Sequence, residues 1–181
     1  MTHIRRARLS DTPFIAATYR TFVESHWASF EQVAPTANEI AARIDAAGDR
    51  YPWLVAEQDQ PLAYAYASPH RTRAAYVSSV DTTIYCAEDA RGKGIGRALY
   101  NALIATLSKQ GYVMAFAGIA LPNAASIALH KAVGFALIGT YPKVGYKHGA
   151  WRDTQWWGRA LSDPRDPPAP ILPVSQVFAG I

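Results

Sequence analysis

Three glycines, at positions 92, 94 and 96, lie in a loop whose composition is typical of an anion-binding site. The loop reads Arg91-Gly92-Lys93-Gly94-Ile95-Gly96-Arg97. Glycine lets the backbone come close to a ligand. A helix that begins at this loop presents free N–H groups and the positive end of its dipole. The loop therefore predicts a phosphate site, although its spacing matches neither the dinucleotide-binding fingerprint nor the Walker loop.

Asp81 and His130 are the candidates for proton transfer. Asp81 lies in an apolar, aromatic stretch, where burial would raise the pKa of its carboxyl group toward useful basicity. His130 lies beside Leu129 and Val133 on an expected helix, and the pKa of histidine suits either an acid or a base. Each residue also has an ordinary structural explanation: Asp81 as the ion-pair partner of an arginine, and His130 as a packed core histidine.

A strand, a loop and a helix are needed to position these residues. The run from Ala74 to Cys86 predicts a long strand that carries Asp81. Apolar residues at helical spacing predict a helix from about Gly94 to Gln110, and the nearly all-apolar Val113–Gly118 predicts a buried strand after it. This strand–helix–strand unit should be parallel and right-handed.

The remaining sequence predicts one domain built around this unit. Strands are expected at 3–8, 53–57, 62–67, 135–144 and 151–161, and helices after Ser10-Asp11, after the capping box at 36–39 and after Asn123. Residues 1–162 should form the domain. The five prolines from Pro164 onward predict that residues 163–181 form an extended tail without strand pairing.

Composition narrows the class of protein. The chain has 181 residues, half of them apolar, which is enough for one real core. No apolar run approaches the roughly 20 residues of a membrane span, and the first residues lack the apolar region of a signal peptide. Cys86 is the lone cysteine, so a reducing cytoplasm is the expected compartment. The net charge of +4 comes without a basic stripe for nucleic acid, and a polyanionic small molecule explains it sufficiently.

The string Arg91-x-x-Gly94-x-Gly96 resembles the pyrophosphate loop of the GNAT superfamily of acetyl-CoA-dependent N-acetyltransferases. Three longer strings resemble the phosphinothricin acetyltransferases within that superfamily. They are Arg50–Glu57, Gly118–Asn123 with Leu129–Phe135, and Gly145–Asp153 with Trp157. The resemblance implies a mixed, mostly antiparallel α+β sheet of six to seven strands flanked by four helices. It also implies acetyl transfer to the amino group of phosphinothricin, methionine sulfoximine or methionine sulfone, and a homodimer.

The resemblance also assigns roles to residues. The family's catalytic glutamate falls on Asp81, which is one methylene shorter, and the family's catalytic histidine falls on His130. The backbone of Ile84, Tyr85 and Cys86 would meet the pantetheine arm, and a backbone N–H there could hold the thioester oxygen. The remaining implied contacts are the pyrophosphate loop Gly92, Lys93, Gly94, Ile95, Gly96 and Arg97, Asn123 for the co-substrate, and Arg71, Arg73 and Phe30 for the acceptor. No metal ion is implied.

Several alternatives remain open at this point. Asn123 can simply cap its helix, and Arg71 and Arg73 can be solvated loop charges. Tyr85 and Tyr141 are weaker candidates for an acid, and an acetyl-cysteine on Cys86 is disfavoured because the family transfers the acetyl group directly. The acceptor can also be a protein N-terminus or a polyamine, and the shorter Asp81 leaves room for a silent acetyl-CoA-binding regulator.

Overall fold

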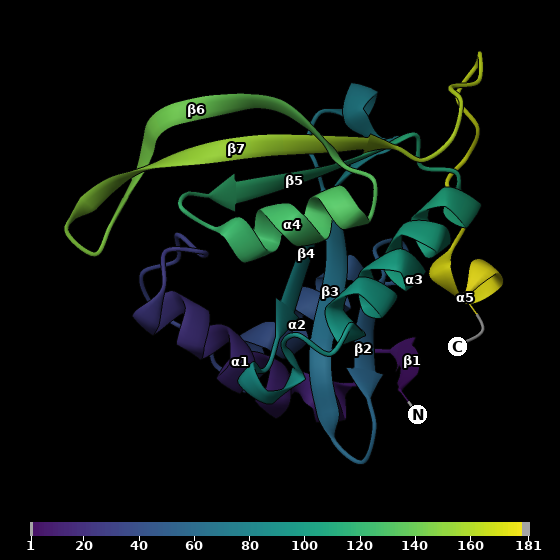
Figure 1. Cartoon of the computed structure of the whole chain (residues 1–181). Coiled ribbons are helices and arrows are strands. Elements are labelled where there is room, and N and C mark those ends of the chain that lie inside the picture. The colour runs from purple at the N-terminus through teal and green to yellow at the C-terminus, as the bar shows by residue number, and fades with distance from the viewer. Residues whose placement is uncertain (1, 179–181) are drawn as a thin grey trace.

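The computed structural model describes residues 2–178, which form a seven-stranded sheet and five α-helices (Figure 1). The strands are β1 (His3–Arg6), β2 (Trp53–Glu57), β3 (Pro61–Pro69), β4 (Ser79–Cys86), β5 (Met114–Ala120), β6 (Ala136–Lys147) and β7 (Ala150–Ala160). The helices are α1 (Thr12–Ser25), α2 (Ala37–Ala47), α3 (Ile95–Gln110), α4 (Ala124–Ala132) and α5 (Val174–Val177). None of the helices in the described part is long and apolar enough to cross a membrane.

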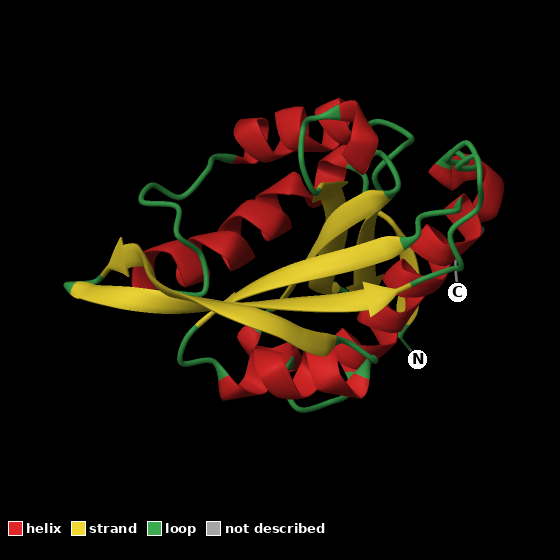
Figure 2. Cartoon of the chain, turned by 90° about the horizontal axis from the view of Figure 1, so that it is seen from above, coloured by secondary structure: helices red, strands yellow, loops and turns green. Residues whose placement is uncertain are grey.

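The expected order of elements and the mixed sheet are confirmed. The strand order is β1-β2-β3-β4-β5-β7-β6, and among the described pairs β4–β5 is the one parallel pair. The helix α3 connects β4 to β5, as the strand–helix–strand pattern predicts. The hairpin of β6 and β7 projects from the rest of the molecule in both views (Figures 1 and 2).

Local sequence signals explain where the helices begin and end. Thr36 and Glu39 form the predicted capping box of α2, with the side chain of Thr36 accepting from the backbone N–H of Glu39. At the ends of α3, Gly94 and Gly111 have φ values of 76° and 95°. Only glycine adopts this left-handed region without strain, so these residues set the length of α3.

One predicted strand is too long. Residues 74–78 do not continue β4: Ala74–Tyr76 form a single 3-10 turn, and the strand begins at Ser79. The region from residue 26 to 36 is a loop. The segment after residue 162 contains no strand up to residue 178, as predicted, but it ends in α5. Val174 of α5 is fully buried, and its N–H donates to the carbonyl of Asp49. The last part of the predicted tail, 179–181, lies outside the described residues.

The sheet separates two apolar clusters. Alternation along β4 places Val80, Thr82 and Ile84 on one face and Asp81 and Tyr85 on the other. The first face packs against α3 in a core that includes Leu99, Leu103 and Leu107. The second face packs against α1 and α2 through Ile15, Tyr19, Val23 and Ile40. Neighbouring residues of β4 therefore enter different environments.

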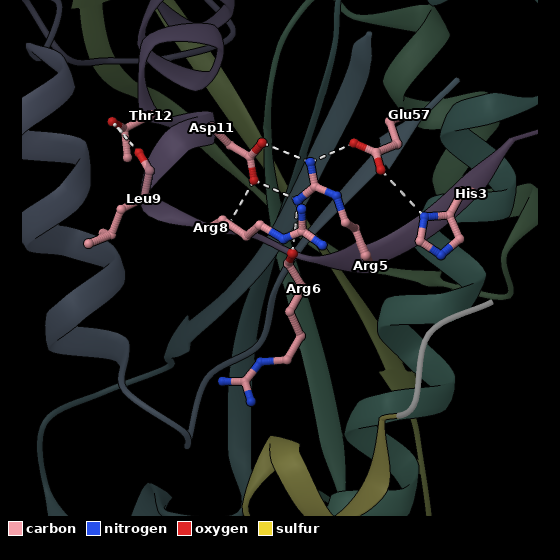
Figure 3. A network of polar contacts seen from close by, with 8 residues as sticks. All are labelled: His3, Arg5, Arg6, Arg8, Leu9, Asp11, Thr12 and Glu57. Carbon is pink, nitrogen blue, oxygen red and sulfur yellow. Dashed lines mark hydrogen bonds and ion pairs between the residues drawn. The ribbon is translucent and has the colours of Figure 1, made fainter. Parts of the chain in front are cut away.

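A charged network fixes the first strand to the start of α1 (Figure 3). Arg5 of β1 lies between two carboxylates and donates to both oxygens of Asp11 at 2.7 and 2.8 Å and to Glu57 of β2. Burial raises the pKa of Asp11, but the guanidinium of Arg5 and the N–H of Arg8 outweigh burial and hold that pKa below its usual value. This network lies at the edge of the sheet and is structural.

Candidate active site

A cleft opens where β4 and β5 stop pairing. The parallel pairing covers Ser79–Asp81 against Met114–Phe116 and ends there. Beyond this point β5 continues against β7 alone, through Ala120. A cavity of about 420 Å³ occupies the gap, lined by Thr82–Cys86 of β4 and Ala117–Ala120 of β5. Asp81 and Phe116 therefore mark the closed end of the cleft, one residue before its walls begin.

The glycine loop forms the wall of this cavity at the N-terminus of α3. Gly92 and Gly94 have φ values of 73° and 76°, and a Cβ on either would meet no protein atom within 4 Å. Backbone N–H groups and the exposed side chain of Arg97 are thus open to a ligand. The side chain of Ile95 is buried in the core, so only its backbone is available, and the side chain of Lys93 is exposed. This cradle fits a phosphate group.

His130 belongs to a buried network on the α3 face of β4. Its Nδ1 lies 2.7 Å from the carbonyl of Ser126, and its Nε2 lies 3.0 Å from the hydroxyl of Tyr100. Tyr100 in turn lies 2.8 Å from the hydroxyl of Thr82. Burial lowers the pKa of His130, which the bond to Ser126 opposes in part. A neutral ring that donates from Nδ1 and accepts at Nε2 satisfies both contacts, and His130 also lines the cavity.

Asp81 belongs to a different network on the opposite face. The pairing of Ser68 with Asp81 in β3 and β4 brings His70, two residues beyond Ser68, to the same face. The His70 Nδ1 lies 2.6 Å from Asp81 Oδ1. Burial raises the pKa of the Asp81 carboxyl group, while the hydrogen bond to His70 and the nearby charge of Arg71 lower it in part. Asp81 and His130 are therefore separated by the strand.

Comparison with known proteins identifies the family of this chain. The family model of the acetyltransferase (GNAT) domain matches residues 4–156. The chain belongs to the GNAT family of acetyltransferases. A phosphinothricin N-acetyltransferase of Streptomyces viridochromogenes is 36% identical over 96% of this chain and 95% of its own length. An L-methionine sulfoximine/L-methionine sulfone acetyltransferase of Pseudomonas aeruginosa is 35% identical over 91% of this chain and 98% of its own length.

A solved structure gives the same answer for the fold. The phosphinothricin acetyltransferase of Sinorhizobium meliloti, solved in complex with AcCoA, matches with a TM-score of 0.88 and 36% identity over 96% of this chain and 99% of that one. The predictions of a GNAT fold and of an acetyltransferase are therefore confirmed.

The acetyltransferase brings most of the predicted co-substrate residues to one cavity. Ile84, Tyr85 and Cys86 line it from β4, but the ring of Tyr85 packs against Tyr19 and Phe22 of α1, with ring centroids 5.0 and 4.7 Å apart. Burial raises the pKa of the Tyr85 hydroxyl well above its ordinary value, so it is a poor acid. Burial also raises the pKa of the Cys86 thiol, which keeps it in the neutral form and agrees with direct transfer.

Asn123 caps α4 and also lies in the lining of the cavity. Its side chain accepts from the backbone N–H of Ser126 at 3.1 Å, which is the geometry of a helix N-cap. It also lines the cavity at the N-terminus of α4. Capping explains its residue type without a ligand. Tyr141, the other candidate for an acid, is half exposed on β6 and outside the cavity lining.

The predicted acceptor residues lie outside the cavity. Arg71 and Arg73 are exposed in the loop between β3 and β4, and the guanidinium of Arg71 lies 5.7 Å from the ring centre of Trp156. Phe30 packs against the hairpin, where a Cβ on Gly145 would clash with its ring. The sequence patterns did not predict the contact of His70 with Asp81 or the contact of Tyr100 with His130. The β3–β4 register is the signal for the first contact, and it depends on where β4 begins.

Proposed function

We propose that this acetyltransferase transfers the acetyl group of acetyl-CoA to the amino group of a small amino-acid-like acceptor of the phosphinothricin, methionine sulfoximine or methionine sulfone type. The observation that carries this proposal is the position of Asp81. A partly buried carboxylate lies at the closed end of the β4–β5 cleft, next to a loop with Arg71 and Arg73. The names of the two relatives support the acceptor class.

Acetyl-CoA binds in the cavity in this proposal. Its pyrophosphate lies on the loop from Gly92 to Arg97, and its pantetheine arm follows the backbone of Ile84–Cys86. The open space above Gly92 and Gly94 supports this placement, because a phosphate needs close approach to backbone N–H groups. Asn123 contributes to the same wall. The thioester then points to the closed end of the cleft, near Asp81.

The acceptor's amino group must lose a proton before it can react. An amino group is mostly protonated at neutral pH and attacks a thioester only after it loses a proton. The raised pKa of Asp81 supports a role for this residue in the proton transfer. His130 lies on the other face of β4, so we assign it to the leaving-group side. There its contacts with Ser126 and Tyr100 hold the wall of the cavity next to the departing sulfur.

The acceptor's carboxylate is recognised by the cationic loop. A guanidinium binds a carboxylate through two parallel hydrogen bonds, which fixes orientation as well as charge. We assign this role to Arg73, with Arg71 as a second cation and Phe30 at the border of the acceptor region. The exposure of both arginines supports access from solvent.

The active form is a homodimer in a reducing cytoplasm. Side chains of the projecting hairpin that are about half exposed support an interface with a second copy, because contiguous apolar surface marks association sites. They are Leu137, Ile138, Tyr141, Val144, Tyr146 and Trp151. Sedimentation of the wild type and of Trp151→Glu tests the dimer, because the introduced charge should dissociate it.

Residues 1–162 form the catalytic domain in this proposal, and the segment from 163 onward is additional to it.

The function is tested by thiol release from acetyl-CoA with a panel of acceptors. The panel holds phosphinothricin, methionine sulfoximine, methionine sulfone, their carboxamides, a polyamine and a peptide with a free N-terminus. Release with the free amino acids and weak release with the carboxamides supports the proposal. Equal rates with acids and carboxamides would move the acceptor toward peptides or amines, and no release with any acceptor would indicate a regulator.

A further inference from the structure

The side chain of His70 is the group on the acceptor side that has a defined partner and a free nitrogen. Its Nδ1 bonds Asp81 at 2.6 Å, and its side chain is 14% exposed. The ring stacks on Phe116, with centroids 4.4 Å apart, and meets the edges of Tyr76 and Trp156 at 5.9 and 6.0 Å. Among residues 2–178, its Nε2 has no hydrogen-bond partner.

Phe116 places this ring at the reacting end of the cleft. Asp81 and Phe116 are the last paired residues of β4 and β5, and the cavity begins at Thr82 and Ala117. A histidine that stacks on Phe116 and bonds Asp81 therefore covers the point where the two strands separate. In the proposed function, the acceptor amine attacks the thioester at this point.

We propose that Asp81 acts through His70: the Asp81 carboxylate orients His70 at Nδ1, and His70 Nε2 is the base that takes the proton from the acceptor's ammonium group. This inference rests on the proposed function. Asp81 is then a positioning residue and His70 is the catalytic residue. The pair makes up for the missing methylene of Asp81, since the imidazole extends the reach of the shorter carboxylate.

The contacts favour this division of labour over direct action by Asp81. Within residues 2–178, the one Asp81 oxygen that makes a side-chain contact is bonded to His70, at the short distance of 2.6 Å that a charged acceptor favours. If Asp81 is a carboxylate, it accepts the Nδ1–H, and that leaves the lone pair on Nε2. The other titratable groups around the pair are Arg71 in the same loop, Tyr76 in the 3-10 turn and Tyr66 on β3.

The reaction balances with this base. The ammonium gives one proton to His70 Nε2, and the neutral nitrogen forms a bond to the carbonyl carbon of acetyl-CoA. The carbon–sulfur bond then breaks with its electron pair on sulfur. The thiolate takes up the second proton of the attacking nitrogen and leaves as the thiol of coenzyme A, while the nitrogen remains in the amide product. His70 returns its proton to solvent.

The substitution His70→Asn separates the base from its structural role. An asparagine amide lies near the position of Nδ1 and still donates to Asp81, but it has no basic nitrogen in place of Nε2. We expect kcat to fall by about 10²–10⁴-fold with unchanged acetyl-CoA affinity. The control is His3→Asn, which changes another histidine paired with a carboxylate, Glu57, on the surface at 3.4 Å, and should leave kcat unchanged. Wild-type kcat in His70→Asn would overturn the proposal.

A second measurement tests the pair without any acceptor. Long-range ¹H–¹⁵N spectra of the histidine rings in the full-length protein report which ring nitrogen carries the proton. We expect neutral His70 to be protonated at Nδ1, and this preference should be lost in Asp81→Ala. The opposite tautomer in the wild type would overturn the proposal. Failure of the acceptor panel together with the expected tautomer would count against the proposed function and not against the His70–Asp81 pair.

Discussion

The two faces of β4 carry different hydrogen-bond networks, which begin at neighbouring residues of the strand. On one face, Thr82 contacts the hydroxyl of Tyr100, which contacts His130. These three side chains form a buried network of neutral, hydrogen-bonded groups. Asp81 leads to His70, in a partly open network with a charge and a free nitrogen. Both networks contain a histidine held at Nδ1 by an oxygen. Only the oxygen of Asp81 carries a charge, and only His70 faces the acceptor side.

The difference shows how one strand can serve two substrates. On the co-substrate side, the side chains of Thr82, Tyr100 and His130 already have hydrogen-bond partners. In our proposal, the acceptor side holds the groups that change their protonation state during turnover. Substitutions on the acceptor side should therefore change the rate or the acceptor's KM, and substitutions on the other side should change acetyl-CoA affinity or stability.

The largest effect is expected from Asp81→Asn. This change keeps the shape of the side chain and removes its charge, so kcat should fall by about 10²–10⁴-fold. The acetyl-CoA affinity, measured by calorimetry, should be unchanged, because Asp81 lies on the face of β4 opposite the network of Thr82, Tyr100 and His130. A variant that keeps most of its activity at neutral pH would remove Asp81 from the account.

His130→Asn should act mainly on stability. The variant keeps a donor for the Ser126 carbonyl but leaves the buried hydroxyl of Tyr100 without its acceptor. We expect the free energy of unfolding to fall by about 1–3 kcal/mol, measured with urea at pH 7.5. A kcat as low as that of Asp81→Asn would instead place the base on the His130 side.

The same histidine predicts a pH dependence. The pKa of His130 is lowered by burial in the folded protein, so the unfolded chain binds the proton more readily. The contribution to stability is complete above the unfolded value of about 6.5 and is lost as pH falls below it, by at most about 1.4 kcal/mol per pH unit. This part of the pH dependence should be absent in His130→Asn. Parallel urea curves of both proteins at pH 7.5 and 5.5 test it.

Gly94→Asn tests the phosphate cradle. Asparagine tolerates a positive φ better than other residues, so the change adds a side chain with little strain. We expect acetyl-CoA affinity to fall at least about tenfold, or 1.4 kcal/mol. The control is Gly149→Asn in the hairpin turn, where φ is 73° and the space is equally open. Equal affinities in the two variants would refute the assignment of the loop.

Arg73→Ala should have the smallest effect. Exposed ion pairs contribute about 0.2–1 kcal/mol, so the acceptor's KM should rise by up to about fivefold. Lysine should restore only part of the loss because it cannot form two parallel hydrogen bonds. The loss should vanish for a carboxamide acceptor. An equal loss for acid and carboxamide would make Arg73 a structural or a general electrostatic residue.

The fold and the residues of the co-substrate side could be predicted from the sequence, because both depend on local patterns. The glycines of the loop, the cap at Asn123 and the apolar period of α3 can each be identified within a few residues of the chain. The acceptor side depends on strand register instead. The contact of His70 with Asp81 requires that β3 pairs Ser68 with Asp81 and that residues 74–78 leave the strand. An apolar pattern that reads as one long strand from Ala74 conceals both facts.

The separation of the two sides is tested most directly by single-turnover acetyl transfer in His70→Asn and His130→Asn. Both variants replace an imidazole with an amide that keeps the Nδ1 contact. The chemical change is therefore the same, and only the face of β4 on which it lies differs. Acetyl-CoA affinity is measured on the same preparations. We predict that the rate of acetyl transfer falls by about 10²–10⁴-fold in His70→Asn and stays within about tenfold of the wild type in His130→Asn. The reverse order would contradict this prediction and place the base on the co-substrate side.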